Sequence, residues 1–285
     1  MPKMFPRTEV GGVSLSRMII GTNWLLGWSH RSPAADNFIK SFHSSKEAMS
    51  PLLETFLGHG VDTIMGPISS QPLMLEAIRH AEDRTGKKMI MIDTPIINVK
   101  SDSLSRKEAY ETIKRSAGIG SKFCLLHHSS VEQLVRKDSE TIERLDEYTK
   151  MIREQGMIPG LSAHMPELVV YSDKNGYDVE TYIQIYNCMG FLMQVEVEYI
   201  AKVIQNAKKP VITIKPMAAG RVTPFVGLTF VWNTIRPCDM VTVGCMTEQE
   251  ADEDIEISLA AIEHRFPGMG QRSSPNPDQA AFANR

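Results

Sequence analysis

The stretch MIMIDTP, residues 89–95, is a short apolar run that ends in polar and small residues. Seven further runs of the same design follow one another along the chain: MIIGTN (18–23), VDTIMGP (61–67), FCLLHHSS (123–130), IPGLSAH (158–164), YIQIYN (182–187), VITIKP (211–216) and MVTVGC (240–245). Strands of a parallel sheet are buried on both faces and therefore read as continuous apolar runs. A helical pattern follows each run, so the sequence predicts an α/β fold, a single (β/α)8 TIM barrel.

The composition predicts one domain that binds a small molecule. Barrels of this kind reach 285 residues as one domain (1–285), and residues 267–285 have the composition of an irregular tail. A formal net charge of -3 favours neither nucleic acid nor a membrane surface as partner. Four cysteines without a C-x-x-C pair, together with no signal peptide and no membrane-spanning run, lead us to expect a cytoplasmic protein.

The connections between the runs carry signals of their own. The segment 24–45 is long for a connection between a strand and its helix, which predicts a lid over the barrel mouth. The stretch DSETIERLDEYTKMIREQG predicts a long helix that begins at Asp138 or Ser139 and ends before Gly156. Because the loops at the carboxyl ends of the strands build the active site of such barrels, the residues that end the eight runs are the candidates for function.

Three stretches resemble the aldo/keto reductase superfamily. They are VGGVSLSRMIIGTNWLLG (10–27), KPMAAGR (215–221) and VTVGCMTEQEADEDIEISLAAIE (241–263), and the similarity extends over about residues 8–265. The resemblance implies reduction of carbonyl compounds with a nicotinamide cofactor. It also implies a catalytic tetrad of Asp, Tyr, Lys and His, in which the tyrosine donates the proton.

Most of that tetrad is missing from this sequence. Met65 stands at the aspartate, Ser70 near the tyrosine, and Asp93 or Thr94 at the lysine. Only the histidine carries over, as His127. The hydroxyl pKa of a serine is several units above that of a phenol, so we expect that the usual hydride reduction is closed to this protein.

The nicotinamide positions of the family are partly retained. Ser162 and Gln184 match residues that hold the nicotinamide amide, although Ala163 stands where asparagine is usual. The stretch GCMTEQEADED is acidic where the family places basic or small residues around the adenosine phosphate. NAD(P) therefore remains an alternative cofactor, and NADP is disfavoured because its 2′-phosphate would be repelled.

The ends of the third, fourth and fifth runs carry Asp93, His127 and His164. Two imidazoles and one carboxylate form a common set of ligands for zinc, manganese or iron, so we expect a divalent metal there, unless these groups merely hydrogen-bond one another. Lys215 would face them across the mouth as a base, a partner for an oxyanion or a Schiff-base amine. The predicted catalytic residues are His127, Lys215 and Asp93.

Other residues near the mouth are candidates for binding the substrate: Asn23, Trp24, Trp28, Tyr186 and Asn187. His128 alternates with His127 along the run, so we expect it to point away from the interior. We expect His30, in the lid segment, on the surface.

Three functions compete. The absent tetrad and the polar rim favour a non-redox lyase, isomerase or hydrolase that acts on a small polyhydroxylated or carbonyl compound by metal- or Lys/His-assisted acid-base chemistry. An NAD(P)-dependent reductase with a reorganised site comes second. A non-catalytic ligand-binding protein is the third.

Overall fold

The computed structural model describes residues 3–268. Eight parallel strands close into a barrel in the spatial order β10-β11-β12-β3-β4-β5-β6-β9. They are β3 (Met18–Gly21), β4 (Thr63–Gly66), β5 (Ile90–Asp93), β6 (Phe123–Leu126), β9 (Ile158–Ala163), β10 (Tyr182–Ile185), β11 (Val211–Ile214) and β12 (Met240–Val243). Each strand lies within one of the apolar runs, so the predicted (β/α)8 barrel is confirmed.

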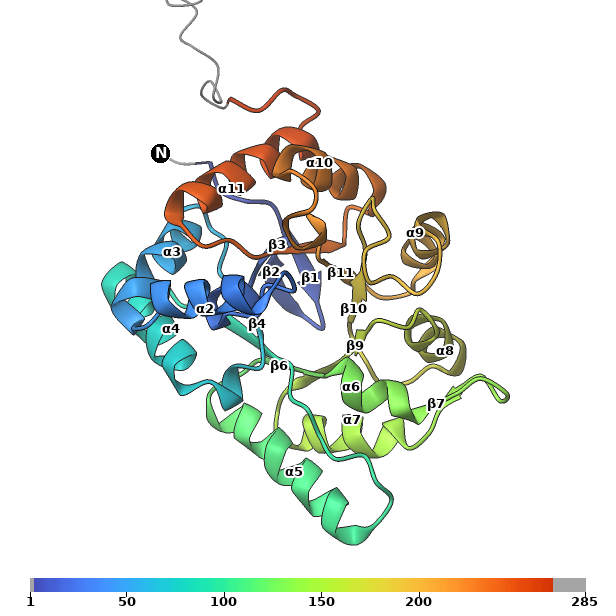
Figure 1. Cartoon of the computed structure of the whole chain (residues 1–285). Helices are drawn as coiled ribbons and strands as arrows, with labels where there is room; N and C mark the ends of the chain where they lie inside the picture. Colours follow the sequence, from blue (N-terminus) through green and yellow to red (C-terminus); the bar gives the residue numbers. More distant parts are fainter. Residues whose placement is uncertain (1–2, 269–285) are drawn as a thin grey trace, which may run out of the picture.

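Helices surround the barrel on the outside (Figure 1). Those that connect successive strands are α3 (Lys46–Gly58), α4 (Pro72–Thr85), α5 (Ser103–Gly118), α7 (Leu145–Glu154), α8 (Glu167–Asn175), α9 (Val197–Asn206) and α10 (Pro224–Thr234). The helix α11 (Glu248–Ile262) follows the last strand, β12. Within residues 3–268, none of the helices combines the length and the apolar character that a bilayer span requires.

Each barrel strand is buried on both faces, which explains its continuous apolar sequence. In β3, Ile19 packs in the cluster that fills the barrel, together with Ile92 of β5 and Phe123 of β6. Its neighbours Met18 and Ile20 belong to the larger cluster between the strands and the helices. Side chains alternate across a strand, so both sets of contacts require apolar residues.

A β-hairpin precedes the barrel. Strands β1 (Arg7–Val10) and β2 (Val13–Ser16) pair antiparallel, and the turn between them, Gly11 and Gly12, has positive φ at both residues (54° and 78°). Positive φ at two central residues is the requirement of the tight hairpin turn, and glycine meets it without strain. Val10 and Leu15 pack in the cluster that fills the barrel, so the hairpin closes its amino-terminal end.

The remaining elements lie in the connections. The lid segment contains α1 (Asn23–Leu26) and α2 (Pro33–Phe42); short elements elsewhere are η1 (Ile68–Ser70), α6 (His128–Val131), η2 (Glu132–Leu134), β7 (Val135–Arg136), β8 (Thr141–Ile142) and η3 (Ala218–Gly220). The helix expected from Asp138 or Ser139 is wrong at its start: α7 begins only at Leu145, because β7 and β8 form a hairpin there and Arg144 has φ of 58°. The predicted tail lies outside the described residues, apart from Pro267 and Gly268.

Candidate active site

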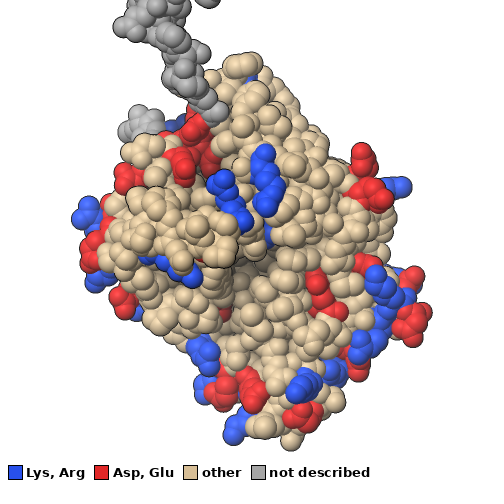
Figure 2. Space-filling model, in the orientation of Figure 1, with Lys and Arg blue, Asp and Glu red and all other residues tan. Residues whose placement is uncertain are grey.

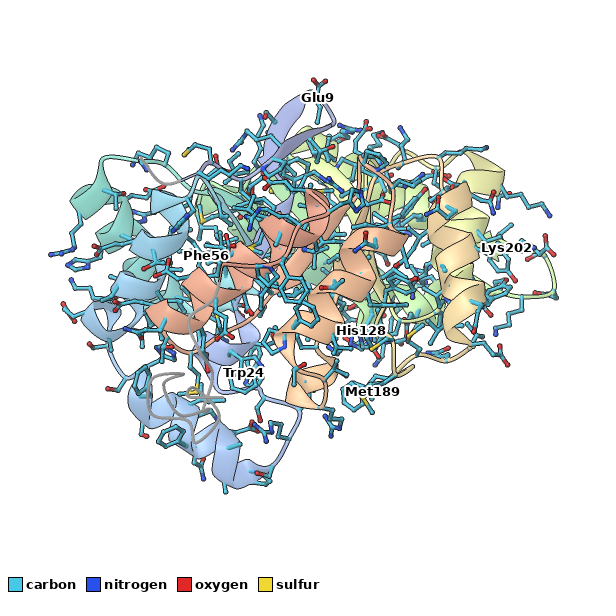
Figure 3. All side chains as sticks on the ribbon, turned by 90° about the horizontal axis from the view of Figure 1, so that it is seen from above. Glu9, Trp24, Phe56, His128, Met189 and Lys202 are labelled. Atoms are coloured by element: carbon cyan, nitrogen blue, oxygen red, sulfur yellow. The ribbon has the colours of Figure 1, made fainter. Side chains whose placement is uncertain are left out.

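A pocket of about 1230 Å³ opens at the carboxyl ends of the barrel strands. In Figure 3, Trp24 and His128 lie toward one end of the molecule, and Glu9 of the hairpin lies at the opposite end. Figure 2 shows the face that carries the pocket, which is hollowed near its centre beside basic side chains. The site therefore lies where the barrel fold predicts it.

Seven of the predicted site residues line this pocket: Asn23, Trp24, Trp28, His127, Ser162, His164 and Lys215. They come from the ends of β3, β6, β9 and β11 and from the lid. The other predicted site residues, Asp93, Tyr186, Asn187 and Gln184, are completely buried and do not line it.

Asp93 is held inside the protein rather than at the mouth. Its Oδ2 accepts a hydrogen bond from Ser116 Oγ at 2.5 Å, and its Oδ1 accepts one from the backbone N–H of Ser69 at 3.0 Å. The carboxylate therefore connects β5 to α5 and to η1. The structure does not assemble the predicted set of Asp93, His127 and His164.

Tyr186, Asn187 and Gln184 are also turned away from the pocket. The hydroxyl of Tyr186 donates to Thr234 Oγ1 at 3.0 Å, and Asn187 Oδ1 accepts from the backbone N–H of Phe191 at 2.9 Å. Gln184 Oε1 has no hydrogen-bond partner among the described residues. The first two residues thus stabilise the loop after β10 and its packing on α10, and they are not placed to touch a substrate.

Lys215 follows β11 and reaches into the pocket. Burial lowers the pKa of its amine to about 8, because the charged form loses solvation. Its Nζ lies 3.3 Å from His30 Nε2, and Asn23 Nδ2 lies 3.3 Å from the same nitrogen. Its backbone has φ of 62°, a strained conformation for a residue with a side chain. Strain of this kind is often found at functional sites.

His30 is exposed, as expected, and the lid also brings it to the lining of the pocket. Burial and the nearby Lys215 lower the pKa of its imidazole. The ring is therefore neutral at physiological pH and able to accept a hydrogen bond from the lysine. The rule that strand ends carry the site could not identify it, because it lies in the connection after β3.

Three imidazoles, those of His127, His128 and His164, line the same pocket as Lys215. Burial and the nearby His128 lower the pKa of His127 to about 4 and that of His164 to about 3. His128 stacks on His164 with ring centroids 3.6 Å apart, and it lines the pocket as well. The expectation that His128 points away is wrong: β6 ends at Leu126 and α6 begins at His128, so strand alternation no longer applies there.

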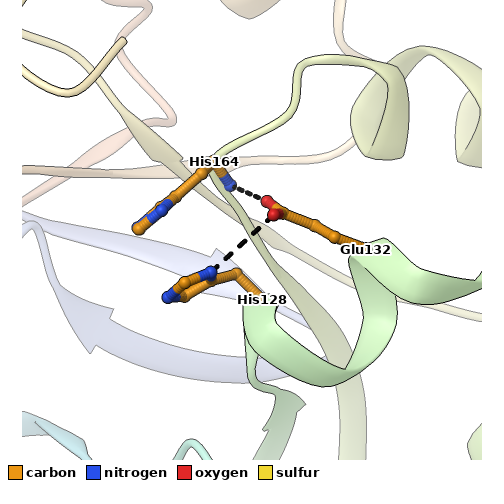
Figure 4. Close-up of side chains that lie close together, drawn as sticks. All are labelled: His128, Glu132 and His164. Carbon is orange, nitrogen blue, oxygen red and sulfur yellow. Dashed lines mark hydrogen bonds and ion pairs between the residues drawn. The ribbon is translucent and has the colours of Figure 1, made fainter. Parts of the chain in front are cut away.

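Glu132 is a member of the site that the sequence did not suggest. Its Oε1 accepts hydrogen bonds from the backbone N–H groups of His164 at 2.6 Å and Met165 at 2.9 Å. Its Oε2 lies 3.7 Å from His128 Nδ1 (Figure 4). The only signal for it in the sequence is its spacing of four residues from His128, which places both on one side of a helical turn.

The sequence matches no protein-family model and no curated protein, whereas solved structures match it clearly. A putative aldo-keto reductase from Pseudomonas aeruginosa superposes with a TM-score of 0.66 at 12% identity, over 92% of this chain and 98% of that chain. This chain has the aldo-keto reductase fold. An aldo-keto reductase from Klebsiella pneumoniae in complex with NADPH gives a TM-score of 0.56 at 14% identity, over 94% and 92%. Aldose reductase from Giardia lamblia gives 0.51 at 12% identity, over 92% and 94%.

On this aldo-keto reductase fold, the positions of the reductase tetrad are altered. Met65, Ser70 and Thr94 line the pocket with His127, and no tyrosine of the described residues does so. The phenol that would donate a proton is therefore missing from the cavity itself.

Charged side chains of both signs line the pocket. Glu250, Glu253 and Asp254 of α11 line one side, where the family resemblance would place the adenosine phosphate. Burial and the nearby Glu250 raise the pKa of Asp254 to about 8, so this carboxyl is mostly protonated at physiological pH. Arg31, Arg115 and Arg221 line the same pocket, so it also offers cations that an anionic group could contact.

Proposed function

We propose that this protein is an enzyme that acts on a small carbonyl compound without redox chemistry, with Lys215 as a reactive amine. The lysine carries the proposal, because its Nζ lies in the pocket and its pKa is lowered to about 8. A substantial fraction of it is then the neutral amine near physiological pH, the form that attacks carbonyl carbon. The titratable groups gathered around it favour an enzyme over a passive binding protein.

The neighbouring imidazoles supply the proton transfers. His30 is placed to accept a proton from Nζ as the amine adds to the carbonyl carbon. His127 and His164 are neutral, so their N–H groups can donate hydrogen bonds to the developing oxyanion. The carbonyl oxygen then leaves as water after it takes up two protons, the one that His30 received from Nζ and one from bulk solvent. The lysine now holds the substrate as an iminium ion, with the second Nζ hydrogen still on its nitrogen.

Reductive trapping tests this proposal. The protein is incubated with a panel of small aldehydes, ketones and keto acids plus cyanoborohydride, and the modified lysine is identified by peptide mass spectrometry. We expect one adduct per chain on Lys215, and none on that peptide in Lys215→Met. A matched variant of an exposed lysine, Lys137→Met, should retain the adduct. Adducts spread over surface lysines without preference for Lys215 would contradict the proposal.

An NAD-dependent reductase is the second candidate, supported by the size of the pocket. Its volume of about 1230 Å³ exceeds the roughly 300–1,000 Å³ of ordinary small-molecule sites. Ser162 also lines the pocket at a position that holds nicotinamide in the resembling family. Titration with NADH, followed by the fluorescence of Trp24 and Trp28, tests this candidate. A response that is reduced in Trp24→Phe supports it, and none at millimolar NADH removes it.

A further inference from the structure

Two side chains of the pocket wall, His128 and His164, form a cluster with Glu132 behind them, and these three residues are named the triad. One ligand atom from each of them lies within 4.8 Å of the others. His128 and Glu132 lie one turn apart along α6 and η2, and His164 follows β9 (Figure 4). Both histidines line the pocket.

The carboxylate of the triad is already oriented. Two backbone N–H groups, those of His164 and Met165, hold Glu132 Oε1 in place. This leaves Oε2 directed toward His128. Within residues 3–268, the ion pairs of Glu132 involve no lysine or arginine. The carboxylate is partly buried, and carboxylates withdrawn from water are usually paired with a cation or bound to a metal, so a positive charge is the natural complement here.

We propose that His128, Glu132 and His164 bind a divalent transition-metal cation, with zinc as the best fit. Two imidazole nitrogens and one carboxylate oxygen are a common zinc set, and three protein ligands leave a coordination position for a substrate or water. The two rings are stacked at an angle of 21°, so each must turn about its Cβ–Cγ bond to aim a nitrogen at the ion. The open position would face the pocket, where the ion would polarise a substrate oxygen.

This set differs from the one that the sequence predicted. Asp93 is replaced by Glu132 and His127 by His128, while His164 is common to both. The inference also goes beyond the proposed function, because Lys215 is not a ligand and its trapping requires no metal.

Metal titration tests the inference with matched variants. The metal-stripped protein is titrated with Zn²⁺ by calorimetry and with Co²⁺ by visible absorption. We expect one ion per chain in the wild type and in Lys215→Met. In Glu132→Gln, His128→Asn and His164→Asn the affinity should fall by at least about 100-fold, beyond the 10–100-fold loss typical of outer-shell partners. Glu132→Gln keeps an oxygen for the backbone N–H groups, so it removes mainly the charge.

The controls are His127→Asn and Asp93→Asn, which alter the sequence-predicted set but leave the triad intact. We expect their affinity to stay within about 3-fold of the wild type, less than the loss of even an outer-shell partner. Circular dichroism without metal shows that each variant is folded. Absence of Zn²⁺ and Co²⁺ binding to the wild type would overturn the inference. Loss of binding in the controls, with retention in Glu132→Gln and His128→Asn, would overturn it as well.

Discussion

Lys215 is held in an environment and in a backbone conformation that are both unfavourable for a lysine. Its amine is largely removed from water, and its backbone has positive φ, as do Ala218 and Ala219 in the same loop. Both features cost stability, and neither is needed to close a barrel. Natural proteins keep such features where activity requires them.

Replacing the lysine should therefore stabilise the protein. In Lys215→Met we expect the free energy of unfolding to rise by about 1–3 kcal/mol at pH 7, the order implied by a lowered pKa. The pKa of the lysine is about 8 in the folded protein and 10.5 when it is unperturbed, so the unfolded chain binds more protons between these two pH values. The destabilisation that the charged Lys215 causes is thus complete below pH 8, and it disappears as the pH rises to 10.5. Urea unfolding from pH 7 to 10.5 measures the difference in unfolding free energy between the wild type and Lys215→Met. A difference that stays constant over this range would contradict the lowered pKa of Lys215.

Asp93 is the opposite case, a predicted site residue with a structural role. Asp93→Ala removes the acceptor of Ser116 Oγ and Ser69 N–H in the interior. We expect a loss of about 2–4 kcal/mol in unfolding free energy, since the part-buried N–H of Ser69 loses its acceptor and the buried Ser116 hydroxyl keeps only a long bond of 3.4 Å to the carbonyl of Thr112. Equilibrium denaturation measures the loss. A loss below about 1 kcal/mol would show that the carboxylate is not a structural acceptor.

At the scale of elements, the buried strands were predictable from the sequence, whereas the turns and the residues next to them were not. The barrel strands were predictable because two buried faces leave a continuous apolar run. The hairpin of β7 and β8 was not, since Glu140 and Arg144 adopt positive φ without being glycine. The direction of His128 was wrong and the position of His30 at the pocket was not predicted, because each lies beyond a strand end, where strand alternation says nothing about direction. The strand-end rule correctly placed His127, His164 and Lys215 at the pocket.

The lid is held in shape by hydrogen bonds between two of its own residues. Asp36 Oδ1 on α2 accepts from both the backbone N–H and the hydroxyl of Ser29, at 2.8 and 2.6 Å. In Asp36→Ala we expect faster amide exchange confined to residues 24–45 and weaker substrate binding, because His30 is then less well placed. Hydrogen exchange by mass spectrometry measures this. Exchange that rises across the whole barrel would contradict a local role.

At the scale of the molecule, the fold is shared with solved aldo-keto reductases. These structural neighbours superpose over most of their length at 12–14% identity, which shows a common barrel. Function in such barrels depends on the loops, so a common fold leaves room for different chemistry.

The hairpin of β1 and β2, at the end of the barrel opposite the pocket, should contribute to global stability and not to ligand binding. Leu15 is fully buried against the barrel interior, so Leu15→Ala should cost about 2–4 kcal/mol of unfolding free energy. The exposed Glu9→Ala is the control and should change little. Thermal and urea unfolding measure both variants. An unchanged stability of Leu15→Ala would show that the hairpin does not close the barrel.

The most direct test of non-redox chemistry at Lys215 is hydrogen exchange at the carbon next to a substrate carbonyl, followed by NMR in D₂O with no nicotinamide present. An iminium ion acidifies that carbon. We predict that the wild type introduces deuterium there into at least one trapped carbonyl compound, and that Lys215→Met does not. Absence of exchange, with NADH-dependent reduction of the same compound, would contradict the proposed chemistry.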